Sequence, residues 1–175
     1  GEAFDGRDDL VGSFTKTFAP DPSEEACETD GQPITGEQVD GVFYFPQYFQ
    51  AIRDVFQYAQ STDRIEQLWA DRSANYGTQA GPGGSGIPPT AAVVNFLDTH
   101  DVARFLYGVQ EQPAPVQRAL MHNALAFVFT AQGIPCLYYG TEQDFAGGND
   151  PANREDLWTS GYATDGDTFQ WIQRL

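Results

Sequence analysis

A nearly continuous apolar run in the middle of the chain ends abruptly in polar and charged residues. Residues 93–97 (VVNFL) have the pattern of a strand that is buried on both faces of a parallel sheet. The next four residues, DTHD at 98–101, include three ionisable side chains. Parallel α/β folds place their chemistry at the C-terminal tips of such strands. Taken alone, however, the same side chains could simply face water at the end of a strand.

Strand and helix patterns alternate along the rest of the chain. The predicted elements are a short helix at 8–18, a loop at 19–38, strands at 40–45, 93–97 and 134–139, and helices at 47–60, from 63 onward, at 115–132 and at 168–175. Pro46 suits the first turn of its helix, and Gly133 suits the position just past the end of another. This alternation predicts one α/β domain over residues 1–175, with parallel strands, outer helices and no second domain.

The charge balance narrows the range of partners. The chain has 25 acidic and 9 basic residues, a net charge of −16. Nucleic acids and anionic membrane surfaces are disfavoured, because binding to phosphates requires a basic face. No apolar run approaches the length of a membrane span. A neutral, hydroxyl-rich ligand remains compatible with this composition.

One glycine-rich stretch matches a nucleotide-binding pattern formally. Residues 81–86 (GPGGSG) fit G-x-G-x-x-G, but that motif must follow a strand and open a helix. Here it is followed by Ile87-Pro88-Pro89 and then by the predicted strand at 93–97. We therefore reject a dinucleotide site.

Several stretches, in order along the chain, resemble conserved stretches of the α-amylase family (glycoside hydrolase family 13). The residues GE and FDG within 1–6 are similar to the family's fifth strand, and DGV at 40–42 with Pro46 is similar to its sixth. The stretch FLDTHD at 96–101 is similar to the family's aromatic-x-x-Asn-His-Asp stretch. The stretches GIP and YGTEQ within 133–143 are similar to the eighth strand and its exit, and GGNDPANRE at 147–155 is similar to the following loop, most closely in fungal-type α-amylases.

The resemblance implies a fold. The chain would be the C-terminal half of a (β/α)8 TIM barrel, from the tip of strand five into helix eight. Its length agrees independently, because a complete barrel of this type needs at least ~200 residues, whereas the chain has 175. Only three full strands and one strand tip are recognisable in it.

The resemblance also implies catalytic roles. Glycoside hydrolysis requires a proton donor at the leaving oxygen and carboxylate charge near an oxocarbenium-like transition state. By resemblance, Glu2 is the general acid/base, Asp101 is the carboxylate that holds sugar hydroxyls and stabilises the transition state, and His100 hydrogen-bonds the same sugar. Glu2 requires a raised pKa for this role, and a nearby like charge such as Asp101 would raise it.

Substrate-binding roles are implied for three further residues. Asp150 and Arg154 resemble glucose-binding residues on the non-reducing side of the cleavage point, and Asp5 is a candidate on the other side. Two of these roles have an ordinary alternative: Asp150 before proline is a common turn start, and Arg154 could pair with Glu155 at a helix end. The alternatives for the catalytic set are a frayed terminus at Glu2 and a structural role for the His-Asp pair.

The sequence departs from the family pattern in two ways. Thr99 stands where the family usually has asparagine, and no residue matches the nucleophilic aspartate of strand four. No metal-ligating residues are assigned and no cofactor is expected in this chain, although calcium is possible in the full-length enzyme.

The resulting expectation is part of a secreted α-amylase that hydrolyses α-1,4-glucosidic bonds in starch-like glucans with retention. The full-length protein is expected to be monomeric, and the isolated chain inactive. Two alternatives remain open: a transglycosylase or maltogenic relative, and a non-catalytic barrel that binds glucans or associates with a transporter.

Overall fold

Three parallel segments form the sheet of the structure, a computed structural model that describes residues 3–15, 28–29, 32–33, 39–80 and 84–175. Strand β3 (Val94–Phe96) pairs in parallel with β4 (Ile134–Cys136), with Val94 opposite Ile134. On its other side β3 meets the chain at Phe43 through a single parallel bridge. The predicted strand at 40–45 is therefore wrong: apart from the bridge at Phe43, residues 40–44 form no strand, because the backbone turns into a helix at Phe45.

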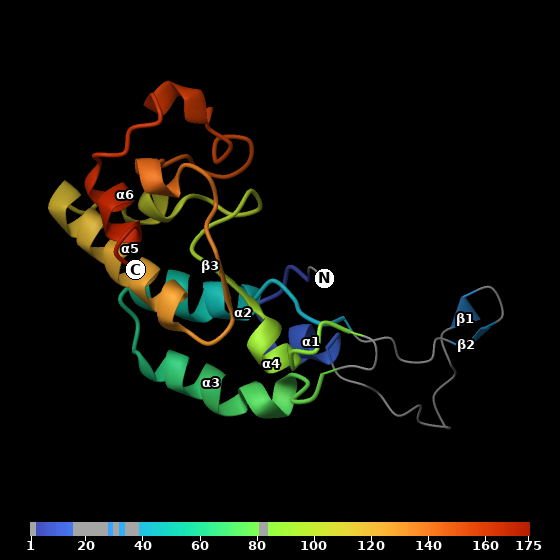
Figure 1. The fold of residues 1–175 in the computed structure, drawn as a ribbon. Helices are drawn as coiled ribbons and strands as arrows, with labels where there is room; N and C mark the ends of the chain where they lie inside the picture. Colours follow the sequence, from blue (N-terminus) through green and yellow to red (C-terminus); the bar gives the residue numbers. More distant parts are fainter. Residues whose placement is uncertain (1–2, 16–27, 30–31, 34–38, 81–83) are drawn as a thin grey trace.

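Helices connect these parallel segments and cover the sheet (Figure 1). The described helices are α1 (Asp8–Ser13), α2 (Phe45–Gln47), a π-helix η1 (Tyr48–Gln57), α3 (Asp63–Asn75), α4 (Pro89–Ala92), a 3₁₀-helix η2 (Phe105–Val109), α5 (Ala114–Thr130), 3₁₀-helices η3 (Thr141–Gln143) and η4 (Leu157–Ser160), and α6 (Asp167–Ile172). Strands β1 (Glu28–Thr29) and β2 (Gln32–Pro33) form a short antiparallel pair where the sequence predicted only a loop. The alternation of parallel strands and helices is confirmed.

The main core lies between β3, η1, η2 and α5. Ile52 of η1, Phe96 of β3 and Leu125 of α5 are almost completely buried within it. The apolar residues of η1 recur about every four positions, which places them on one side of the helix, toward the strands. Burial of these side chains is the main force that holds the helices on the sheet.

Gly133 separates α5 from β4 and has a positive φ of 136°. A Cβ at this position would lie 2.6 Å from the Val93 carbonyl oxygen and 2.7 Å from Asn95 Nδ2. Only glycine allows so close an approach of the two backbones, and φ in this region is rare for other residues. The helix ends earlier than predicted, with Ala131 as its C-cap, so Gly133 lies two residues beyond the cap and allows the close approach to β3 rather than ending the helix.

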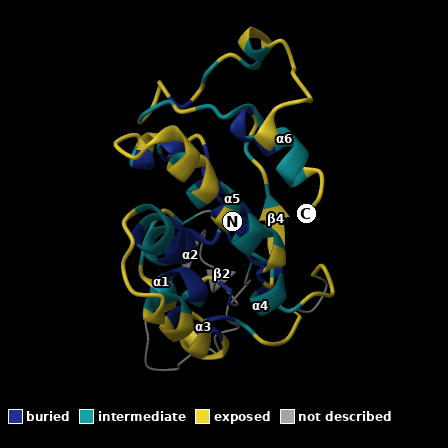
Figure 2. Ribbon diagram, turned by 90° about the vertical axis from the view of Figure 1, so that its left-hand side faces the viewer, coloured by how far each residue is buried: buried dark blue, intermediate teal, exposed yellow. Residues whose placement is uncertain are grey.

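Strand β4 is more exposed than the sequence predicted. Ile134 is 46% exposed, and Leu137 and Tyr139 just beyond the strand are also open to solvent; Figure 2 shows this strand mostly in the colour of exposed residues. The expectation of a buried strand is wrong because, within the described part of the chain, β4 has a strand partner only on its β3 side.

Candidate active site

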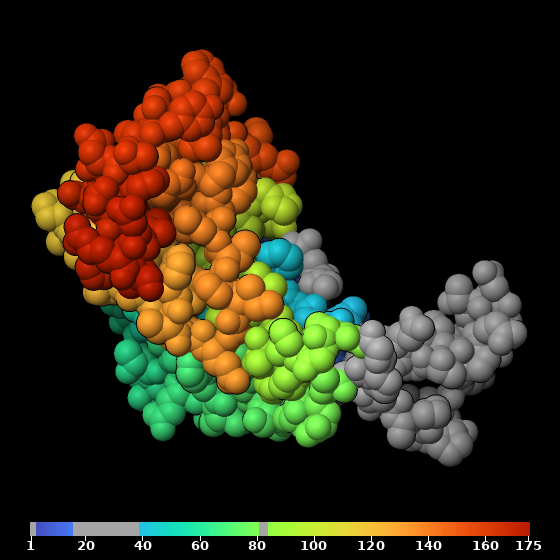
Figure 3. All heavy atoms as spheres, viewed as in Figure 1, coloured from blue at the N-terminus to red at the C-terminus, as the bar shows by residue number. Residues whose placement is uncertain are grey.

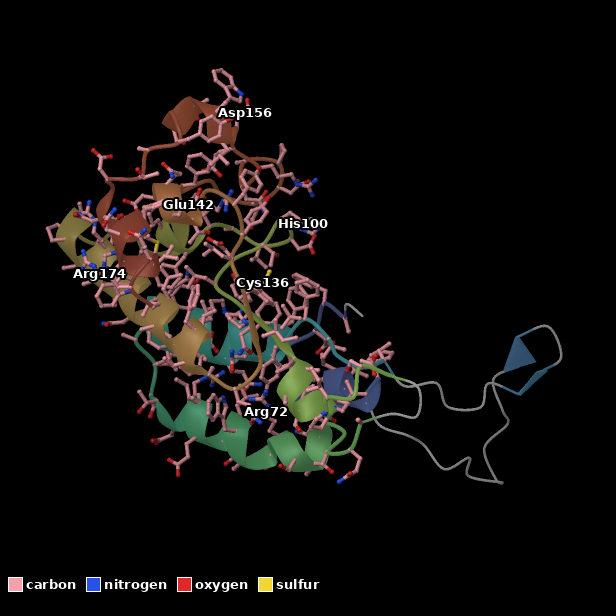
Figure 4. The ribbon with its side chains drawn as sticks, viewed as in Figure 1. Arg72, His100, Cys136, Glu142, Asp156 and Arg174 are labelled. Carbon is pink, nitrogen blue, oxygen red and sulfur yellow. The ribbon has the colours of Figure 1, made fainter. Side chains whose placement is uncertain are left out.

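The turn after β3 separates its ionisable side chains into one buried and two exposed groups. Asp98 is only 2% exposed, whereas the side chains of His100 and Asp101 are 52% and 33% exposed. Figure 4 places His100 at the end of the sheet opposite Arg72, whose guanidinium donates to the carbonyls of Thr90 and Gln132 before the two strands begin. His100 and Asp101 therefore lie at the carboxyl end of the strands.

Asp98 is held in the interior by hydrogen bonds that stabilise the fold. Its Oδ2 accepts a hydrogen bond from the Phe105 amide at 3.0 Å, and its Oδ1 accepts one from the Thr141 hydroxyl at 2.8 Å. Burial raises the pKa of this carboxyl above its usual range, although both hydrogen bonds oppose the shift. Asp98 thus ties the starts of η2 and η3 to the tip of β3.

Thr99 stabilises the turn that carries His100 and Asp101. Its hydroxyl oxygen accepts a hydrogen bond from the Asp101 amide at 3.1 Å. Asparagine makes a similar side-chain bond to the backbone two residues on, and threonine can replace it in this role. The replacement of the family's usual asparagine is therefore compatible with the turn.

His100 and Asp101 lie against each other. The imidazole Nε2 is 3.4 Å from Asp101 Oδ1. The carboxylate can hold the imidazole in one orientation, while both groups remain accessible to a ligand. A carboxylate and an imidazole presented together can hydrogen-bond neighbouring hydroxyls of one sugar ring.

Asp101 opens onto a cavity of about 440 Å³. The aromatic side chains of Phe4, Tyr48 and Tyr107 line it, and Asn149 reaches it from the loop after β4. A concave site with aromatic walls and a few polar groups is the usual form of a small-molecule pocket. The volume and lining are suited to a ligand with flat apolar faces and hydroxyl groups.

The beginning of the chain contributes to the same cavity through Phe4. This ring packs 4.8 Å from Phe45 and 5.6 Å from Phe49, measured between ring centroids. Glu2, the predicted acid/base, lies outside the described residues. Its role stays a prediction; Phe4, two residues later, lines the same cavity as Asp101.

The three predicted substrate-binding residues, Asp150, Arg154 and Asp5, form ion pairs or hydrogen bonds with other residues of this chain. Asp150 and Arg154 form an exposed ion pair at 2.7 Å, next to Asn149 at the cavity. Asp5 accepts hydrogen bonds from the amide and the guanidinium of Arg7, and the amide bond is the main reason that the pKa of Asp5 is lowered. Neither Asp5, Asp150 nor Arg154 is among the described residues that line the cavity, so their substrate contacts stay predictions.

A buried ion pair near the site was missed by the sequence analysis. Arg104 is completely buried, and its Nε donates to Glu155 Oε2 at 3.1 Å. The other carboxylate oxygen of Glu155 accepts from the amides of Ala146 and Gly147. Glu155 therefore pairs with Arg104 rather than with Arg154, and residues 150–155 do not form a helix.

The guanidinium of Arg104 also stacks on an aromatic ring, with its central carbon 4.0 Å from the Tyr138 centroid. One signal for this burial was present in the sequence: Arg104 is the only charged residue of the otherwise apolar segment 102–107. The identity of its partner was not readable, because Glu155 is 51 positions away.

The described residues contain neither a metal-binding cluster nor a helix of membrane-spanning length. No group of three histidine, cysteine or acidic side chains in this part of the chain is arranged to hold a metal ion. Nor is any helix within the described ranges long and apolar enough to cross a membrane.

Comparison with curated proteins gives several α-amylases. The chain is 43% identical to Alpha-amylase 1 of Schwanniomyces occidentalis over 81 residues, which cover 46% of this chain and 15% of that protein. It is 32% identical to the Saccharomycopsis fibuligera α-amylase over 136 residues, 78% of this chain and 24% of that protein. A cyclomaltodextrin glucanotransferase of Niallia circulans is 35% identical over 69% of the chain and 16% of its own length. The chain thus spans a quarter or less of these relatives.

Solved structures give the same result, although no protein-family model matches the chain. An α-amylase from Malbranchea cinnamomea superposes with a TM-score of 0.70 and 26% identity, over 98% of this chain and 28% of that one. An Anoxybacillus α-amylase superposes with a TM-score of 0.72 and 25% identity, over 99% of this chain and 31% of that one.

Proposed function

Because this chain belongs to the α-amylase family, glycoside hydrolase family 13, we propose that the protein containing it hydrolyses α-1,4-glucosidic bonds in starch-like glucans with retention of configuration. The fold is part of that family's (β/α)8 barrel. The observation that carries the proposal is the exposed His100–Asp101 pair at the carboxyl end of β3, where Asp101 opens onto an aromatic-lined cavity.

The proposed mechanism assigns one role to each group. Glu2 protonates the leaving oxygen, and Asp101 holds hydroxyls of the sugar at the cleavage point more tightly as positive charge develops at its anomeric carbon. His100, oriented by Asp101 at 3.4 Å, hydrogen-bonds a neighbouring hydroxyl of the same ring. The flat faces of Phe4, Tyr48 and Tyr107 provide apolar surface for the ring faces of the glucan.

The loop after β4 would bind the sugars on the non-reducing side. Asp150 and Arg154 are exposed and paired at 2.7 Å, so they can exchange part of that interaction for hydrogen bonds to hydroxyls. Asp5 is proposed to act on the opposite side of the cleavage point. The isolated 175 residues are proposed to be inactive, because none of them matches the family's nucleophile. Secretion, a monomeric state and calcium binding are likewise proposed for the full-length protein, by family resemblance alone.

Replacement of Asp101 tests the proposed mechanism. In the full-length protein, Asp101→Asn should lower kcat on a soluble maltooligosaccharide by at least about 100-fold, because a charge that stabilises the transition state is lost. The control is Asp63→Asn, the same chemical change at an exposed position on α3. Equal kcat for the two variants would exclude the assigned role of Asp101. Absence of any released sugar from the unsubstituted protein would exclude hydrolysis altogether.

One alternative has specific support. The Niallia circulans relative is named as a glucanotransferase, and a transglycosylase would use the same residues with a sugar hydroxyl as the acceptor. Product analysis separates the two reactions: hydrolysis releases one reducing end per bond cleaved, whereas transfer redistributes chain lengths without a net increase in reducing ends. A non-catalytic glucan-binding or transporter-associated barrel would show neither change.

A further inference from the structure

The side chain of Asn153 is completely buried between the loops that follow β3 and β4. These loops adjoin at one end of the molecule (Figure 3). The Asn153 Nδ2 lies 2.9 Å from the His100 carbonyl oxygen, 2.8 Å from that of Val102 and 3.4 Å from that of Thr99. One side chain thus contacts the backbone on both sides of Asp101.

These three contacts determine the orientation of the Asn153 amide. A carboxamide nitrogen carries two hydrogens, so the shorter contacts to His100 and Val102 are full hydrogen bonds and the longer contact to Thr99 is shared. All three neighbours are acceptors, so only a donor can face them. The bonds fix the peptide group immediately before Asp101 and the peptide group that follows Val102.

The loop that carries Asn153 is itself held in place. Gly147 donates its amide to Glu155 and accepts a hydrogen bond from the Arg104 amide at 3.0 Å. A Cβ at Gly147 would overlap the Ala152 carbonyl oxygen, which shows how closely this loop folds on itself. Asn153 is therefore a fixed donor, and the turn at 99–102 is positioned against it.

We propose that Asn153 is a positioning residue that holds the His100–Asp101 turn in its reactive geometry and couples it to the loop carrying Asp150 and Arg154. This proposal rests on the function proposed above. Asn153 touches no substrate, because it is buried behind the turn. Its effect on catalysis passes through Asp101, which a displaced turn would move relative to the sugar.

Two variants of the full-length protein test this role. Asn153→Asp places carboxylate oxygens against three carbonyl oxygens. Asn153→Ala removes the donor without adding charge, and it is the variant to measure if Asn153→Asp does not fold. Misplacement of a catalytic group by about 1 Å can cost on the order of 100-fold in rate. We expect kcat per folded molecule to fall roughly 10- to 100-fold for Asn153→Asp, with a smaller fall for Asn153→Ala. KM should change less than kcat, because the contribution proposed for Asp101 is largest in the transition state.

The matched control is Asn123→Asp, the same substitution at an exposed position on α5, which should leave kcat unchanged. Hydrogen exchange of the peptide covering 98–104 supplies a readout that does not depend on activity, and it should be faster in both Asn153 variants alone. Unchanged exchange in that peptide, or unchanged kcat per folded molecule with only a lower melting temperature, would overturn the proposal. If the unsubstituted protein releases no sugar, the proposed function fails and the exchange comparison alone decides the positioning role.

Discussion

Removing the charge of Glu155 tests whether Arg104 depends on its ion pair. The Arg104 side chain is completely buried, while that of Glu155 is 27% exposed. In Glu155→Gln the amide oxygen can still accept from the amides of Ala146 and Gly147. The new NH₂ group then faces Arg104 Nε–H, so that two donors are placed against each other.

The size of the effect follows from these contacts. Loss of one hydrogen bond to a charged group costs about 1.5–3 kcal/mol, and a buried charge that loses its partner completely costs about 3–5 kcal/mol. Arg104 keeps two other interactions, with Asp98 Oδ1 at 3.9 Å from Nη1 and with the Tyr138 ring. We therefore expect Glu155→Gln to lower the free energy of unfolding by about 2–3 kcal/mol, in the upper part of the first range and below the second.

Urea unfolding of the full-length protein, followed by intrinsic fluorescence, measures this loss. The control is Asp167→Asn, which removes one charge from the exposed Arg118–Asp167 pair at 2.6 Å and should cost at most about 1 kcal/mol. When Arg104 is first replaced by Met, position 104 carries no positive charge that could lose its partner. In that background Glu155→Gln should lower the free energy of unfolding by less than it does in the native protein. A loss no larger than that of Asp167→Asn, or one independent of Arg104, would refute the reasoning.

Two further predictions concern the loop after β4 and α5. Gly147→Ala should lower the free energy of unfolding by about 1–3 kcal/mol in urea unfolding, because the added Cβ overlaps the Ala152 carbonyl oxygen. The control is Gly166→Ala, whose Cβ would have no atom within 4 Å, and it should change stability by less. Equal losses in the two variants would contradict the overlap. Partial burial lowers the pKa of His122, which stacks 5.1 Å from Trp171. Because the folded protein then binds fewer protons than the unfolded chain, the stability that His122 contributes is present above its ordinary pKa of about 6.5 and is lost as the pH falls below it. The melting temperature should therefore fall less on acidification in His122→Phe than in the native protein, and identical pH profiles would contradict this.

Local sequence patterns were sufficient for most of the helices and for the central strand. The apolar run at 93–97 and the polar turn after it are both readable without tertiary information, because burial on two faces requires an uninterrupted apolar segment. Helix α5 begins one residue before its predicted Pro115 start and ends two residues before the predicted end. The helix over 47–60 was predicted from its apolar face, but its π-helical hydrogen bonding was not.

The sequence could not show which aspartate of the DTHD turn is buried and which faces the cavity. Asp98 and Asp101 are the same residue type three positions apart, yet one is bonded to Phe105 and Thr141 in the interior and the other faces the cavity. The direction of each side chain depends on where the chain turns after β3 and on what packs above it. The resemblance to the family identified Asp101 where the chemistry of the residues alone could not.

The sequence by itself determined the alternation of strands and helices, the place of the polar turn after residue 97 and the family to which its motifs belong, because these depend on neighbours within a few positions. Only the tertiary structure decided that Asn153 caps the turn bearing Asp101, that Glu155 pairs with Arg104, and that β4 is open on one side. Those contacts join residues about fifty positions apart or depend on what lies beside a strand. A single sequence carries no record of such distances, since they are set by how the helices pack and where the loops meet.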